Sequence, residues 1–166
     1  MPDRTPLIAA NWKMNKTLAE TEAFFDGFVP GANELSGVDV VICPPATALV
    51  TAANRAKDTR IKVAAQNMHF EQSGAFTGEL AAPMLTEFGA WGTILGHSER
   101  REYFGETDEA LAKKVPVALD AGLTPILCVG ETEAERDADA TEAVLARQLA
   151  ADLAEVDASR LGDVVI

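Results

Sequence analysis

The feature that most constrains this chain is the alternation of short β-branched runs with longer stretches of helical periodicity. The apolar runs begin near residues 7, 38, 62, 91, 124 and 164, roughly 24 to 40 residues apart, which is the length of one strand plus one helix. Strands joined through helices pair in parallel, because the chain must cross back over the sheet between them. We therefore expect one α/β domain over residues 1–166, with about six parallel strands and five crossover helices. The last run, Val164–Ile166, is expected to start the sixth strand.

Several helix ends are also indicated by the sequence. Thr17 and Glu20 have the spacing of a capping box at the start of the first helix. Gly122 follows the helix expected over 107–121, where a C-terminal capping glycine belongs. A single long amphipathic helix is expected from about residue 132 to residue 156.

Right-handed crossovers leave two architectures, an open doubly wound sheet or a section of a (β/α)8 barrel, and periodicity does not separate them. Polar residues follow the C-terminal ends of the apolar runs in five places: Asn11 and Lys13, Cys43-Pro44-Pro45, Gln66-Asn67, Gly96-His97, and Gly130-Glu131. Both architectures place their active sites at that end, but a barrel gathers residues from many strands into one mouth. The chain has neither GxGxxG nor a P-loop, which weakens the nucleotide-binding alternative.

The net charge and the cysteine content exclude several classes of partner and ligand for this chain. Fourteen Lys and Arg against 26 Asp and Glu give a net charge of −12, which would repel nucleic acid and anionic membrane surfaces. No apolar run approaches the roughly 18 residues of a membrane helix. Cys43 and Cys128 lie far apart and are expected to be reduced, buried thiols of a cytoplasmic protein. With His69 and His97 they have no zinc-motif spacing, so we expect no metal.

Lys13 is the first candidate for chemistry. It follows the first strand and lies between the apolar Trp12 and Met14, whereas surface lysines usually have polar neighbours. A partly desolvated ammonium at a strand's C-terminal end suits an anionic substrate or a developing oxyanion. The alternative is a lysine that extends from a loop into solvent. Asn11 would orient the lysine or simply end the strand.

His97 is the second candidate, in a segment where a strand ends at Gly96 and a helix begins. Ser98 is the expected N-cap, with Glu99 in the first turn. The positive potential of a helix N-terminus favours the neutral imidazole, which can donate one hydrogen bond to a carbonyl oxygen. The alternative is a structural histidine bonded to the backbone.

The third candidate is the loop Gln72–Glu79, which has glycines at 74 and 78 and carries Phe76 and Thr77 at its tip. Exposed aromatic residues on loops often anchor a partner. The alternative is a tight turn in which Phe76 folds back on its own domain.

Four segments together resemble the triosephosphate isomerase family, in order and at the expected spacing. They are Asn11-Trp12-Lys13-Met14-Asn15, Gly74-Ala75-Phe76-Thr77-Gly78-Glu79, Ile94-Leu95-Gly96-His97-Ser98-Glu99-Arg100-Arg101 and Leu127-Cys128-Val129-Gly130-Glu131-Thr132. The resemblance covers the chain from Leu7 to Ile166 and implies an incomplete (β/α)8 TIM barrel.

The resemblance also implies an activity of glycolysis and gluconeogenesis, the interconversion of dihydroxyacetone phosphate and glyceraldehyde 3-phosphate without metal or cofactor. It makes His97 the catalytic electrophile, Lys13 the cation that contacts the substrate, and Asn11 a substrate-site residue. Glu99 is then a buried glutamate beside Lys13, and Ser98 and Cys128 are supporting candidates. The loop 74–79 resembles one that reaches across the family's homodimer, with Thr77 near the partner's site.

The sequence departs from the family at its end. The family's catalytic glutamate follows the sixth strand in a segment like Ala-Tyr-Glu-Pro, and the resemblance implies a truncated chain that stops before this general base, the lid and the phosphate-binding glycines. We therefore expect impaired substrate binding, an inactive chain, and self-association through the loop 74–79 or through open sheet edges. The alternative is a non-catalytic, self-associating partial barrel with vestigial site residues.

Overall fold

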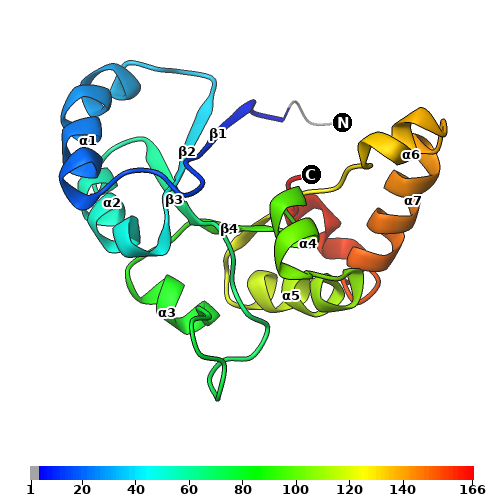
Figure 1. Ribbon diagram of the computed structural model, residues 1–166. Helices are drawn as coiled ribbons and strands as arrows, with labels where there is room; N and C mark the ends of the chain where they lie inside the picture. Colours follow the sequence, from blue (N-terminus) through cyan, green and yellow to red (C-terminus); the bar gives the residue numbers. More distant parts are fainter. Residues whose placement is uncertain (1–3) are drawn as a thin grey trace.

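Five parallel strands form a curved sheet in the computed structural model, which describes residues 4–166. In chain order they are β1 (Leu7–Asn11), β2 (Asp39–Cys43), β3 (Ile61–Ala65), β4 (Gly92–Leu95) and β5 (Thr124–Leu127). The spatial order is the same as the chain order, and every neighbouring pair is parallel. A doubly wound sheet reverses direction at a switch point, whereas a barrel adds each strand beside the last. The fold is therefore an incomplete TIM barrel, and the open-sheet alternative is excluded (Figure 1).

The expected sixth strand is reduced to one bridge. Val165 donates its N–H to the Pro125 carbonyl at 3.0 Å and accepts from the Leu127 N–H at 2.8 Å, so the segment lies beside β5 in parallel. A 3-10 turn over Ala158–Asp163 precedes it. The expectation that Val164–Ile166 begin a sixth strand is borne out by this single parallel bridge beside β5.

Helices surround the outer side and the ends of the curved sheet (Figure 1). They are α1 (Leu18–Asn33), α2 (Leu49–Ala56), α3 (Ala82–Glu87), α4 (Ser98–Phe104), α5 (Asp108–Asp120), α6 (Glu133–Asp137) and α7 (Thr141–Asp152), with a 3-10 turn at Ala46–Ala48. The capping box of Thr17 and Glu20 is present at the start of α1. Gly122 has a φ of +76° just after α5, which confirms the expected glycine cap.

The single helix expected over 132–156 was wrong, because α6 and α7 are separated. Asp139 has a φ of +56°, in the left-handed region that interrupts a right-handed helix. Aspartate tolerates this conformation better than most residues and is a weak helix former. The break turns the chain after the short α6, so that α7 packs along α5.

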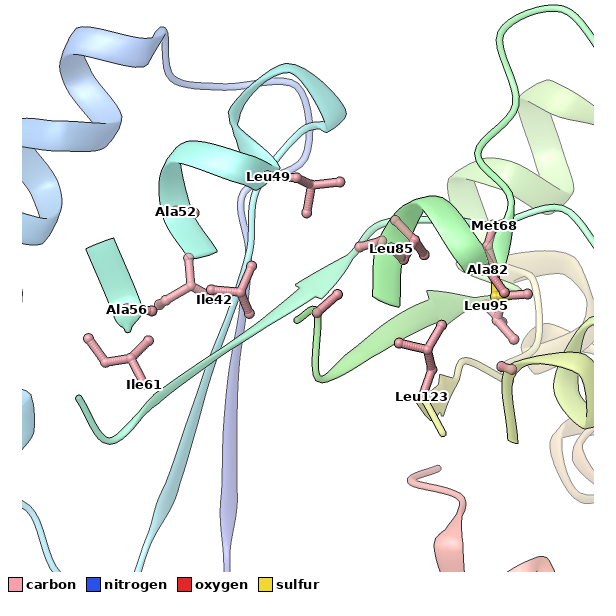
Figure 2. Close-up of a cluster of buried hydrophobic side chains, with 14 of the residues drawn as sticks. Ile42, Leu49, Ala52, Ala56, Ile61, Met68, Ala82, Leu85, Leu95 and Leu123 are labelled. Carbon is pink, nitrogen blue, oxygen red and sulfur yellow. The ribbon is translucent and has the colours of Figure 1, made fainter. Parts of the chain in front are cut away.

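The two faces of the sheet bury different clusters. The outer face packs against the helices, and Figure 2 shows part of this cluster, with Ile42 of β2 near Leu49 and Ala52 of α2. The inner face buries a smaller group made of Val41, Cys43, Ala64 and Ile94, with Leu7, Trp91, Ile126 and Cys128 packed against it. Such alternation is what a barrel wall requires, since successive residues of a strand point to opposite faces.

The β1 edge of the sheet is unpaired within the part of the chain that is described. β1 has β2 as its sheet neighbour on one side only, and Ile8 on this strand is 59% exposed. No helix of residues 4–166 is long and apolar enough to cross a membrane.

Candidate active site

The carboxyl ends of the strands converge on a pocket of about 320 Å³. Its lining residues lie at or after the carboxyl ends of β1, β2, β3 and β4, namely Asn11, Lys13, Met14, Ala46, Leu49, Gln66, Asn67, Gly78, Glu79, Leu80, His97, Glu99, Arg100 and Phe104. Four of the sequence candidates, Asn11, Lys13, His97 and Glu99, therefore share one pocket although 88 residues separate the first from the last.

The Lys13 backbone is hydrogen-bonded at both its N–H and its carbonyl. Its N–H donates to Asn11 Oδ1 at 2.9 Å, and its carbonyl accepts from Gln66 Nε2 at 2.9 Å. Lys13 has a φ of +52°, a conformation that costs free energy for a residue other than glycine. The same Gln66 amide donates to the Cys43 carbonyl at 2.9 Å, which ties the Lys13 loop to the end of β2. Gln66 was not singled out as a site residue, although its place directly after β3 was the available signal.

Glu99 pairs with Lys13 across the pocket, with 2.7 Å between Nζ and Oε1. The hydrogen bond from the lysine, followed by the charge of the lysine, holds the pKa of the Glu99 carboxyl below its ordinary value. The glutamate lies beside Lys13, as the resemblance implies, but its side chain is 40% exposed rather than buried.

His97, not Ser98, caps α4, so the expected N-cap was wrong. The His97 backbone is extended, and its Nδ1 accepts from the Glu99 N–H at 3.2 Å. Ser98 is the first residue of the helix and is exposed. Because Nδ1 accepts a backbone proton, the neutral ring carries its own proton on Nε2. The imidazole therefore has one donor left for a ligand in the pocket that it lines.

Cys128 does not line this pocket. It lies half-buried beside a second cleft of about 820 Å³, which runs between the loops after β4 and β5 and which His97 also borders. Both cysteines are free thiols, as predicted. Burial raises the pKa of Cys128, and burial with the nearby Cys128 raises the pKa of Cys43 to about 12.

The loop tip with Phe76 and Thr77 is folded back in part. The Phe76 ring stacks on His69 with 4.2 Å between ring centroids, yet 42% of the residue stays exposed. Gly78 and Glu79 of this loop line the chain's own pocket, whereas the exposed Thr77 does not.

A buried polar network supports the pocket floor and was missed in the sequence. Lys114 pairs with Glu106 in the interior, and its ammonium donates to Asn67 Oδ1 at 2.9 Å. Asn67 Nδ2 in turn donates to Glu79 Oε2 at 3.0 Å. The signal was the position of Lys114 on the apolar stripe of α5, next to Leu111 and Val115 in the helical repeat.

The two carboxylates that line the pocket are both engaged. Glu99 is paired with Lys13, and Glu79 accepts from Asn67 and lies 4.0 Å from Arg100. In residues 4–166, no group of three or more His, Cys, Asp or Glu side chains is placed to hold a metal ion. The pocket therefore offers hydrogen-bond donors and an ammonium, and within the described residues it lacks an unpaired carboxylate.

Comparison with known proteins gives matches to a single family. The family model described as "Triosephosphate isomerase" matches residues 6–166. A triosephosphate isomerase of Clostridium novyi is 50% identical over 98% of this chain, and those of Solibacter usitatus and Symbiobacterium thermophilum are 48% and 49% identical over the same share. The chain spans 65%, 66% and 64% of the lengths of these three relatives.

Proposed function

The chain belongs to the triosephosphate isomerase family, and on this premise we propose that it supplies the carbonyl-polarising half of a triosephosphate isomerase site. The reaction is the interconversion of dihydroxyacetone phosphate and glyceraldehyde 3-phosphate in glycolysis and gluconeogenesis. The observation that carries this proposal is the meeting of Lys13, Asn11 and His97 in one pocket at the carboxyl ends of β1 and β4.

Each of the three residues has a distinct part in the proposed chemistry. The Nε2–H of neutral His97 donates to the substrate carbonyl oxygen and stabilises the charge that develops there as the enediolate forms. The Lys13 ammonium attracts the anionic substrate and offsets the same negative charge. Asn11 accepts the Lys13 N–H at its Oδ1, which leaves its Nδ2 as a further donor for a substrate in the pocket that it lines. Glu99 holds the lysine in place.

The proton that leaves the substrate carbon needs a base that the described residues do not provide. Glu79 and Glu99 are both engaged, and losing general base catalysis costs roughly 10² to 10⁴ in rate. We therefore propose that residues 1–166 bind triose phosphate weakly and do not turn it over alone. The test is a coupled isomerase assay on chain repurified away from host isomerase. Turnover no higher than buffer supports the proposal, and turnover well above buffer that survives repurification contradicts it.

A second candidate function is a non-catalytic partial barrel that associates with itself. The unpaired β1 edge and the exposed Ile8 favour it, because an open parallel edge offers unsatisfied backbone groups to another chain. The two candidates differ in what a complementing segment would do, since only a competent half-site gains turnover when the barrel is completed.

Association with a second copy is proposed under either function. Exposed apolar side chains surround the pocket mouth and the loop 74–79, among them Phe76, Met14 and Phe104. We expect a homo-oligomer formed through this loop, through the β1 edge, or through both, in the cytoplasm where Cys43 and Cys128 stay reduced. Light scattering at micromolar concentration should find a multiple of the chain mass, and a well-behaved monomer would contradict this proposal.

A further inference from the structure

Arg101 makes an unusual set of contacts for a residue on a surface helix. It lies in α4, four residues after His97, and its side chain is only 16% exposed. Its Nε–H donates to the Gly96 carbonyl at 2.8 Å, and one terminal nitrogen donates to the Cys128 carbonyl at 3.2 Å. The guanidinium also pairs with Asp108 at 2.5 Å and with Asp152 at 2.6 Å. One side chain thus joins the loops after β4 and β5 to α5 and α7.

The Gly96 contact fixes the peptide that carries His97. Gly96 has a φ of +72°, and a β-carbon there would lie 2.9 Å from the Cys128 carbonyl oxygen and 3.0 Å from an Arg101 nitrogen. Its N–H donates to Glu106 Oε2 at 3.1 Å in the interior. The residue before His97 is therefore held at its N–H by a buried carboxylate and at its carbonyl by a largely buried guanidinium.

We propose that Arg101 is a positioning residue for His97, which it orients by holding the Gly96 carbonyl rather than by touching substrate. With the Gly96–His97 peptide fixed, the His97 ring keeps Nδ1 on the Glu99 N–H and Nε2–H toward the pocket. The catalytic significance of this orientation rests on the proposed function, whereas the orientation itself is a property of the chain.

A purely structural role for Arg101 makes a different prediction. Asp152 is fully buried and Asp108 largely so, and both require a positive charge nearby. A lysine at this position would keep that charge, but a compact ammonium cannot donate to two carbonyls and two carboxylates that are arranged around a planar fork. R101K therefore separates charge balance from positioning.

The chain contains a built-in reference for the measurement, because it has two histidines. His69 Nδ1 accepts from the Glu71 N–H at 2.9 Å, the same kind of bond that His97 makes, and its ring stacks on Phe76 away from Arg101. Arg147 provides the matched control, since it pairs with Asp108 at 2.6 Å and contacts neither carbonyl.

The experiment is nitrogen-15 NMR of the histidine rings in the full chain, R101K and R147K, without substrate or turnover. In the unsubstituted chain we expect a direct through-hydrogen-bond coupling between Arg101 Nε and the Gly96 carbonyl carbon, with His97 held as the Nε2–H tautomer. In R101K the His97 ring nitrogens should shift toward a mixture of both tautomers while His69 stays unchanged, and in R147K neither ring should move.

Two results would overturn the proposal. One is a folded R101K, with His69 unchanged, whose His97 ring matches that of the unsubstituted chain. The other is the absence of the Arg101–Gly96 coupling in the unsubstituted chain, which decides the matter if R101K does not fold. A chain that shows the coupling and the tautomer shift but no isomerase half-site would contradict the proposed function alone.

Discussion

The Lys13 ammonium and the Glu99 carboxylate form an ion pair of 2.7 Å that joins the carboxyl ends of β1 and β4 across the pocket mouth. Both side chains are about half exposed, and ion pairs in contact with solvent contribute little to the stability of a fold. Lys13 also keeps a left-handed backbone conformation that costs free energy. We therefore infer that the main role of the pair is to position the Lys13 ammonium at the pocket mouth, and that it adds little to the stability of the fold.

The first prediction concerns the pH dependence of this pair. Because the lysine lowers the pKa of Glu99, the pair is present at neutral pH and is lost as the pH falls through that lowered pKa. In Lys13→Met the Glu99 pKa should rise toward its ordinary value. Carboxyl-detected NMR titration measures this, with Lys16→Met as the control, since Lys16 lies over the Trp12 and Phe24 rings. Identical Glu99 titrations in the chain and in Lys13→Met would contradict the prediction.

The second prediction concerns the two thiols. A Cys43 pKa of about 12 leaves roughly one part in 10⁴ as thiolate at about pH 8, and the side chain is also fully buried. Cys43 should therefore react with iodoacetamide at least about 100-fold more slowly than a free cysteine, and only after Cys128. Peptide mass spectrometry of the timed reaction separates the two sites. Rapid labelling of Cys43 in the folded chain would show that the inner face of the sheet is open.

The third prediction compares two glycines. A β-carbon at Gly92 would overlap the Thr124 carbonyl oxygen on β5, so Gly92→Ala must push β4 and β5 apart and should cost about 2 kcal/mol or more. Gly27 is exposed inside α1, and a β-carbon added there would meet nothing within 4 Å, so Gly27→Ala should stabilise by about 0.5 to 1 kcal/mol. Urea denaturation of both variants checks the opposite signs. Equal effects would mean that β4 and β5 are less closely packed than described.

The fourth prediction concerns Asp152, whose pKa is raised to about 6 by burial despite its bond to Arg101. Its ordinary pKa is 3.8, so the folded chain binds a proton here more tightly than the unfolded chain does. The stability contributed by this group is present at acidic pH and is lost as the pH rises through about 6.

Asp152→Asn removes this dependence. The free energy of unfolding of D152N, relative to the unsubstituted chain, should therefore increase by about 1 kcal/mol between about pH 5 and about pH 7.5. Urea denaturation at the two pH values measures the difference, in which the titration of other groups cancels. A difference that is constant with pH, or that decreases, would contradict the raised pKa.

Local signals in the sequence were reliable where one residue determines the backbone. The Thr17–Glu20 capping box and the capping glycine Gly122 each act within one helical turn, so each predicted its helix end correctly. The parallel sheet also followed from the spacing of the apolar runs. The choice between a barrel and an open sheet did not follow from that spacing, which both share; it came from the polar residues at the strand ends and from the family resemblance, and the order of β1 to β5 confirms it.

The failures depend on contacts between distant residues or on competing local conformations. Asp139 adopts a left-handed conformation inside an otherwise helical pattern, and His97 rather than Ser98 reaches the Glu99 N–H. The burial of Lys114 and Arg101 requires carboxylates from other segments, which periodicity alone does not reveal. The candidates after β1 and β4 could be named because strand ends are local, and Glu99 followed from the resemblance, whereas the supporting Gln66 and Lys114 were not singled out.

The most direct test of the account is complementation of the half-site. The chain is mixed with a polypeptide that covers the remaining C-terminal third of the Clostridium novyi relative, and conversion of glyceraldehyde 3-phosphate to dihydroxyacetone phosphate is followed. We predict no turnover from either piece alone, turnover from the mixture, and its loss when the chain carries His97→Gln. A stable complex without turnover, or equal turnover with His97→Gln, would contradict the claim that this chain holds the carbonyl-polarising half of the site.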